Sequence, residues 1–275
     1  MHFFASILVC FLLGKAIHDV EGIINGHDAT EGQFPHMAYL QASAGKCSYV
    51  CGGALLTKKH IMTAAHCVAM HRTGNIKVAL GVTDFHNKPS MQQRKVEHIK
   101  VHSEYKGGRR KSLKNWYRSI HRTFTGPSGD KEYNDIAIIT LSQEVTLGPV
   151  VKTINLPPKS YRLPFDQDAR LSGFGRTVIV KENDPIPPPT THLQWLDMKV
   201  LHSRDAIVTD SEFLADKEYG DGTWSNAAKG DSGSPLVKDN QVIGVAVSVS
   251  DEEHTTRFQI VTYYLDWIKK YAELA

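Results

Sequence analysis

The sequence predicts an all-β fold that ends in one helix. Short runs of alternating apolar and polar residues recur along the chain, for example at Lys77–Val82 and Gln241–Val247, and clusters of Gly, Pro and Asn separate them. Such runs are typical of the strands of a β-barrel or β-sandwich. From Thr262 to Leu274 the apolar residues fall at helical spacing instead, which predicts a terminal helix packed on the sheet. The Pro-rich segment Asp184–Pro189 cannot join the interior of a sheet and predicts an extended surface loop.

The first residues have the features of a secretory signal. The apolar run Phe3–Leu13 is followed by Lys15, and it is shorter than the about 20 residues that span a bilayer. Small residues at Gly14 and Ala16 predict a signal peptide over residues 1–16, with a signal anchor as the alternative. No later segment is apolar enough to cross a membrane, and 41% hydrophobic with 22% charged residues is ordinary for a globular chain. We therefore expect a secreted, extracellular protein with no membrane partner.

The segment Lys229–Pro235 places Ser232 between two glycines and after an aspartate. A serine hydroxyl is a poor nucleophile unless a base and a group that orients the base lie beside it. The segment Thr63–Cys67 offers His66 as the base, and Asn134–Ile138 offers Asp135 among apolar residues. The order along the chain is therefore His, Asp, Ser.

These three motifs, in this order, resemble those of the trypsin/chymotrypsin-like serine proteases. Five further segments extend the resemblance over nearly the whole of residues 23–275: Ile23–Gly26, Gln33–Ala38, Cys51–Leu56, Leu171–Gly175 and Tyr264–Ile268. The resemblance implies two six-stranded antiparallel β-barrels of the chymotrypsin type with a C-terminal α-helix. It also implies one protease domain at 23–275 and a short propeptide at 17–22.

The family's mechanism, carried over onto the matching residues, implies a secreted serine endopeptidase that forms an acyl-enzyme on Ser232. His66 would be the general base and acid, and Asp135 would orient it. The backbone N–H groups of Gly230 and Ser232 would form the oxyanion hole. The resemblance implies protein or peptide substrates and no cofactor, and we expect a monomer.

In this family a new N-terminal ammonium pairs with the aspartate that precedes the nucleophile. Here Ile23 would pair with Asp231 in a buried ion pair. Gly22 precedes Ile23, so a trypsin-like activator has no Arg or Lys at this junction. Either another protease removes residues 17–22 or signal processing ends directly at Ile23.

The family resemblance also pairs Cys51 with Cys67 in the disulfide that closes the histidine loop. Cys47 then has no partner, and either a buried thiol or intermolecular pairing is open to it. Leu214 and Ala228 stand where the family has further cysteines.

The resemblance places the floor of the substrate pocket at Asn226 and its walls at Val249 and Thr256. A neutral floor offers no charge to pair with Arg or Lys and so argues against trypsin-like cleavage, and bulky walls favour an elastase-like preference for small side chains. A chymotrypsin-like preference is the alternative. The alternating stretch around Val249 also allows Ser250 to be the wall residue.

Residues 106–133 form an insertion relative to the family. Eight Lys or Arg against Asp130 and Glu132 give this segment a charge of +6, whereas the whole chain carries +3. We interpret it as an exosite for a polyanionic partner, with a solvated loop as the alternative. No nucleic-acid-binding motif accompanies the charge, so no nucleic-acid partner is predicted.

The sequence also bears on a binding role and on a metal site. The chain could be a non-catalytic protease homologue that binds partners through the basic insertion, because Ser234 replaces the family's usual glycine and the pocket disulfide is missing. A metal site is not predicted. Five histidines do not have the spacing of metal ligands: His71, His86, His98, His102 and His121. The segment with Asp84, His86 and Asn87 resembles a calcium loop only weakly, because Asp84 is its lone carboxylate.

Overall fold

The computed structural model describes residues 23–44, 47–106, 134–176, 190–202, 209–250 and 253–275. Three predicted features lie outside this part of the chain: the signal peptide and propeptide at 1–22, residues 107–133 of the basic insertion, and the Pro-rich loop at 184–189. The state of the Cys47 side chain also lies outside it.

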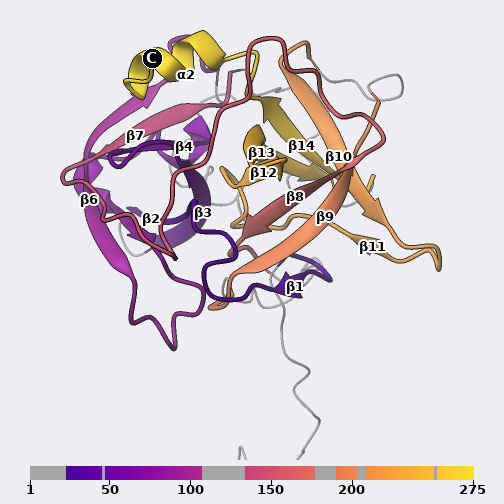
Figure 1. Ribbon diagram of the computed structural model, residues 1–275, viewed down its shortest axis with the longest axis horizontal. Helices are drawn as coiled ribbons and strands as arrows, with labels where there is room; N and C mark the ends of the chain where they lie inside the picture. The colour runs from indigo at the N-terminus through magenta and orange to yellow at the C-terminus, as the bar shows by residue number, and fades with distance from the viewer. Residues whose placement is uncertain (1–22, 45–46, 107–133, 177–189, 203–208, 251–252) are drawn as a thin grey trace, which may run out of the picture.

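The first half of the chain forms one closed antiparallel barrel (Figure 1). Its strands follow one another around the barrel in the order β2-β3-β4-β7-β6-β5. Their bounds are β2 Met37–Ala44, β3 Cys47–Leu55, β4 His60–Thr63, β5 Ile76–Leu80, β6 Gln92–Val101 and β7 Ala137–Leu141. Two short 3-10 helices, η1 Ala65–Cys67 and η2 Thr73–Asn75, lie between β4 and β5.

The second half forms a barrel of six strands, closed where β9 pairs with β10. Its strands are β8 Asp168–Gly173, β9 Gln194–Val200, β10 Glu212–Glu218, β12 Pro235–Lys238, β13 Gln241–Ser250 and β14 Thr255–Ile260. Two-residue strands, β1 His27–Asp28 and β11 Trp224–Ser225, pair with β9 and β10. The prediction of an all-β fold with two six-stranded antiparallel barrels is therefore confirmed.

The C-terminal helix α2, Leu265–Tyr271, lies against the first barrel although it follows the last strand of the second (Figure 1). Tyr264, Ile268 and Ala272 are buried in the same core cluster as the first barrel's aliphatic side chains. The helix is confirmed but shorter than predicted. Among the described residues, no helix is long and apolar enough to cross a membrane.

Alternation along the strands explains both cores. In β5 the side chain of Lys77 is exposed while that of Val78 is buried, because successive residues of a strand point to opposite faces. Burying one large aliphatic side chain stabilises a fold by about 1.5–3 kcal/mol. These buried side chains form the core of each barrel, and the core supports the site residues that lie at the edge of the barrel.

The two barrels meet at a glycine. Gly52 of β3 donates its backbone N–H to the carbonyl oxygen of Ser232, 2.8 Å away, and Ser232 belongs to the loop before β12. A Cβ at Gly52 would lie 2.9 Å from the Cα of Ser234 and would overlap the Ser234 hydroxyl. Only a residue without a side chain allows this approach.

Candidate active site

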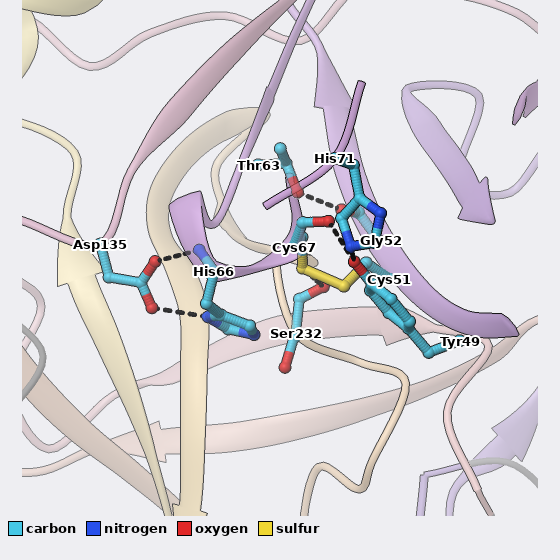
Figure 2. The surroundings of a disulfide bond; sticks show 9 residues. All are labelled: Tyr49, Cys51, Gly52, Thr63, His66, Cys67, His71, Asp135 and Ser232. Carbon is cyan, nitrogen blue, oxygen red and sulfur yellow. Dashed lines mark hydrogen bonds and ion pairs between the residues drawn. A yellow bond between two sulfur atoms is a disulfide. The ribbon is translucent and has the colours of Figure 1, made fainter. Parts of the chain in front are cut away.

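His66 lies in η1, directly after β4, with buried Ala65 and Cys67 on either side of it. Both oxygens of Asp135 accept hydrogen bonds from it (Figure 2). The backbone N–H of His66 donates to Oδ1 at 2.8 Å, and the ring Nδ1 lies 2.6 Å from Oδ2. Because the carboxylate accepts, the proton of the neutral ring sits on Nδ1, and Nε2 is left as an acceptor.

Asp135 lies near the end of the sequence that forms the first barrel, two residues before its last strand, β7. Its side chain is 1% exposed, and that of His66 is 14% exposed. Asn134, the residue before it, has a positive φ of 54°, a conformation that Asn tolerates better than most residues. This turn directs the carboxylate toward the histidine.

Ser232 comes from the second barrel, in the loop between β11 and β12. Two glycines allow the sharp bend around it: Gly230 has φ +113° and Gly233 has φ +82°, values that glycine adopts at little cost. The loop is closed by hydrogen bonds from Gly233 N–H to the Ala246 carbonyl at 2.7 Å and from Ser234 N–H to the Asp231 carbonyl at 2.9 Å. Figure 2 shows the Ser232 side chain beside His66 and the disulfide.

The disulfide predicted between Cys51 and Cys67 is present and joins β3 to η1. The Cys67 sulfur lies 3.6 Å from the carbonyl oxygen of Ser232, a packing contact because a disulfide sulfur carries no proton. Cys51, His66 and Cys67 are close enough together to suggest a metal site among the described residues. Metal ions bind thiolates rather than disulfide sulfurs, so this group does not fit a metal.

Asp231, the residue before Ser232, is fully buried. Its two carboxylate oxygens accept the backbone N–H groups of Gly175 and Ala228, each at 2.8 Å. Burial raises the pKa of this carboxyl to about 7, while the two amides act in the opposite direction. If the Asp231 carboxyl ionises in this buried position, the carboxylate therefore needs a positively charged partner.

Ile23 is also fully buried, and it packs in the core cluster of the second barrel. The next residue, Ile24, donates its N–H to the carbonyl of Asn226 at 3.1 Å. The segment that begins at Ile23 thus pairs with residues 224–226, ahead of the loop that carries Asp231. In the uncut chain the Ile23 nitrogen belongs to a peptide bond and carries no charge.

The three predicted pocket residues lie together. Val249 of β13 pairs directly with Thr256 of β14, and Ser250 pairs with Thr255, because the register shifts between Ala246 and Ser248. The Oδ1 atom of Asn226 accepts hydrogen bonds from the Thr256 hydroxyl and from the N–H of Ala227, the latter at 3.0 Å. Val249, rather than Ser250, is therefore the residue opposite Thr256.

One set of residues around the site was not predicted. Buried side chains of β10, β14 and the start of α2 form a hydrogen-bonded chain that reaches Asn134, the neighbour of Asp135; its members are Glu212, Gln259 and Tyr264. No local sequence pattern marks them, because they come from separate elements. The buried glutamate and glutamine in strands of otherwise apolar pattern are the one available signal.

Comparison with known proteins agrees with this architecture. The family model described as Trypsin matches residues 23–268. Chymotrypsin of Phaedon cochleariae is 30% identical over 261 residues, which cover 91% of this chain and 82% of that protein. Chymotrypsin-C of Mus musculus is 30% identical over 276 residues, covering 92% and 89% of the two chains.

Two solved structures show the same fold. The one described as "Structure of GrC" aligns with a TM-score of 0.70 at 21% identity, covering 91% of this chain and 100% of that one. Human heparin binding protein aligns with a TM-score of 0.66 at 20% identity, covering 90% and 96%. The fold, the family model and the chymotrypsin relatives agree, and the chain belongs to the trypsin family of serine proteases.

Proposed function

We propose that this protein is a secreted serine endopeptidase whose catalytic residues are His66, Asp135 and Ser232. The observation that carries the proposal is the double hydrogen bond from His66 to Asp135, at 2.8 and 2.6 Å. With its proton on Nδ1, the ring can take up a further proton at Nε2, and the Ser232 side chain lies beside it (Figure 2).

The chemistry follows the template of this family. The Ser232 oxygen attacks the carbonyl carbon of the peptide bond, and its proton moves to Nε2 of His66. When the tetrahedral intermediate collapses, His66 gives that proton to the leaving amine, and an ester to Ser232 remains. Water then attacks the ester with His66 as base, and the serine regains its proton. Asp135 stays ionised and stabilises the imidazolium.

Two backbone amides are available for the oxyanion. Within the described part of the chain, neither the N–H of Gly230 nor that of Ser232 donates to any acceptor. Unsatisfied N–H groups beside a nucleophile are the donors that an oxyanion needs, and one such donor contributes about 2.7–4 kcal/mol to transition-state stabilisation.

Activation would follow release of Ile23 as the new N-terminus. The buried carboxyl of Asp231, with its raised pKa, is the partner that a new ammonium would require. N-terminal sequencing of the secreted protein tests this step together with the signal peptide. A mature start at any residue other than Ile23 contradicts the pairing.

The pocket residues support a specificity unlike that of trypsin. Asn226 is uncharged, and its Oδ1 is already used by Ala227 and Thr256. Val249 and Thr256 face each other with side chains where open pockets have glycine. We propose cleavage after small or moderately sized apolar residues, in the elastase-like or chymotrypsin-like range. A peptide-library profile dominated by cleavage after Arg or Lys would contradict this.

Labelling with a fluorophosphonate probe tests the catalytic proposal directly. The protein that begins at Ile23 should react, and Ser232→Ala should not. Ser234→Ala is the matched control, because it removes a second, buried hydroxyl of the same loop and should still be labelled. If the correctly processed protein is not labelled, the enzyme proposal fails and the non-catalytic homologue takes its place.

The basic insertion suggests a polyanionic partner in addition to the peptide substrate. The amide of Asn134 donates to the Glu104 carbonyl at 3.2 Å, so residues that flank the insertion on its two sides lie in contact next to Asp135. The sequence between them, residues 106–133, carries a charge of +6. Deleting residues 106–131 should reduce retention on heparin-agarose, and unchanged retention would rule the exosite out.

A further inference from the structure

The turn that carries Asp135 is held by one contact within the first barrel and by one from the residue that follows the second barrel's last strand and precedes α2. Asn134 makes one hydrogen bond with each end of its side-chain amide: Nδ2 donates to the Glu104 carbonyl at 3.2 Å, and Oδ1 accepts from the hydroxyl of Tyr264 at 3.1 Å. The first contact determines which end of the amide faces Tyr264, because only the NH₂ end can donate to a carbonyl. Both contacts hold a residue whose φ is positive, at 54°.

Tyr264 is itself held in place. It is 3% exposed and occupies the position directly before the first residue of α2. Its hydroxyl lies 2.8 Å from Oε1 of Gln259, whose Nε2 donates to buried Glu212 at 3.0 Å. The single hydroxyl proton is thus shared between the amide oxygens of Gln259 and Asn134, and the ring of His102 packs against the tyrosine ring at 5.5 Å.

This chain of contacts joins three segments. Glu212 begins β10, Gln259 belongs to β14, and Tyr264 precedes α2, so the second barrel and the helix both act on the turn of the first barrel. Burial raises the pKa of the Tyr264 hydroxyl above its ordinary value. The hydroxyl therefore stays protonated and can donate a hydrogen bond.

We propose that Tyr264 is a positioning residue for Asp135, acting through the side chain of Asn134. This deepens the proposed function, because its kinetic consequence exists only if Asp135 works with His66 and Ser232. Without the hydroxyl, Asn134 loses one of its two side-chain contacts and its left-handed turn relaxes. The Asp135 carboxylate then shifts away from the His66 ring, and the imidazolium is less stabilised.

The test is Tyr264→Phe, with Tyr263→Phe as the matched control, since Tyr263 is the adjacent tyrosine and is 58% exposed. The pKa of His66, followed by NMR and assigned by its loss in His66→Ala, should fall by about half a unit or more in Tyr264→Phe, because a nearby carboxylate raises a histidine pKa. If peptides are cleaved, kcat should fall roughly 10-fold while KM changes less than about twofold. Tyr263→Phe should match the wild type in both measurements.

A His66 pKa and a kcat unchanged in folded Tyr264→Phe overturn the proposal. If that variant does not fold, Asn134→Gly replaces it: glycine accepts the positive φ and removes the side-chain link. It should lower the His66 pKa by a similar amount, and an unchanged pKa overturns the proposal. Because the NMR titration needs no hydrolysis, a lowered His66 pKa in a protein that cleaves nothing would support the positioning role and contradict the proposed function alone.

Discussion

Ser234 has a buried hydroxyl directly behind the nucleophile. The residue is fully buried, and its Oγ makes no hydrogen bond to any described residue. A buried polar group without a partner costs about 1–3 kcal/mol of stability. The glycine that the family usually has at this position would avoid that cost.

We expect Ser234→Ala to raise the free energy of unfolding by about 1 kcal/mol, because it removes the unsatisfied group and keeps the Cβ. Urea denaturation measures the change. Thr63→Val is the contrasting variant: the Thr63 hydroxyl donates to the Gly52 carbonyl at 2.7 Å, so its loss should destabilise the protein. Similar destabilisation by both variants would show that the Ser234 hydroxyl has a partner.

His36 is the second buried residue with an orphan polar atom. It is 6% exposed, its Nε2 makes no hydrogen bond to a described residue, and burial lowers its pKa from 6.5 to about 4. In the unfolded chain the same ring takes up a proton near pH 6.5. Between pH 6.5 and 4 the unfolded state therefore binds more protons than the folded state does.

The free energy of unfolding should accordingly fall as the pH drops from 6.5 to 4, by up to roughly 3 kcal/mol from this residue. His36→Phe keeps a ring of similar size and should remove that part of the acid sensitivity in denaturation curves recorded across this range. His98→Gln, at a side chain that is 75% exposed, should leave it unchanged. If the free energy of unfolding of His36→Phe falls just as steeply with decreasing pH, His36 is not the source of the acid sensitivity.

Among the elements, the loop before β12 depends on the segment that begins at Ile23. The Asp231 carboxyl has its pKa raised to about 7 by burial, so in the uncut chain it is neutral below that pH and a costly buried anion above it. The raised pKa means that the folded state binds the extra proton between pH 3.8 and 7, and the stability of the uncut chain falls as the pH rises through that interval. A new ammonium at Ile23 would offset this loss.

We therefore expect cleavage before Ile23 to raise Tm more at pH 7.5 than at pH 5. Calorimetry of the cut and uncut chains at both pH values gives the difference, in which groups common to both forms cancel. In Asp231→Asn the difference should lose its pH dependence. If cleavage of the protein with Asp231 intact raises Tm equally at both pH values, the proposed ion pair is contradicted.

At the scale of the whole molecule, the site exists only where the barrels touch. His66 and Asp135 belong to the first barrel and Ser232 to the second, and a 2.8 Å hydrogen bond from the Gly52 N–H to the Ser232 carbonyl links the first barrel directly to the loop of Ser232. A small displacement of one barrel changes the position of Ser232, the proposed nucleophile, relative to His66, the proposed base.

Gly52→Ala tests this contact. Its Cβ would lie 2.8 Å from the end of the Met37 side chain and 2.9 Å from the Cα of Ser234. Overpacking of this kind costs about 1–3 kcal/mol, and the shift of Ser232 should lower the rate of fluorophosphonate labelling by roughly 10-fold or more. Gly74→Ala, where an added Cβ meets nothing within 4 Å, should be labelled at the wild-type rate. Normal labelling of Gly52→Ala would mean that the interface adapts without moving Ser232.

The differences between prediction and structure have local physical causes. The helix was predicted from Thr262 but begins at Leu265, because the N–H groups of Tyr263 and Tyr264 bond to carbonyls three residues back in tight turns. It ends at Tyr271, and Glu273 then has a positive φ. Apolar spacing records which residues face the core but not where the α-helical hydrogen bonds start and stop.

The choice between Val249 and Ser250 shows a different limit. The stretch Val245–Ser250 alternates Val with Ala or Ser, and this pattern does not show whether Val249 or Ser250 lies opposite Thr256. The shift of register between Ala246 and Ser248 decides the pairing, and such an irregularity is set by the partner strand rather than by the strand's own sequence.

The strand pattern, the terminal helix, the family and the residues proposed for catalysis could be predicted from the amino-acid sequence, because each of these is recorded in a short segment with its own spacing or motif. How those segments meet depends on the three-dimensional fold. The His66–Asp135 contact joins residues 69 positions apart, and the Tyr264–Asn134 contact joins residues 130 positions apart. Such distances close only when both barrels have formed around their cores, and no local pattern carries that information.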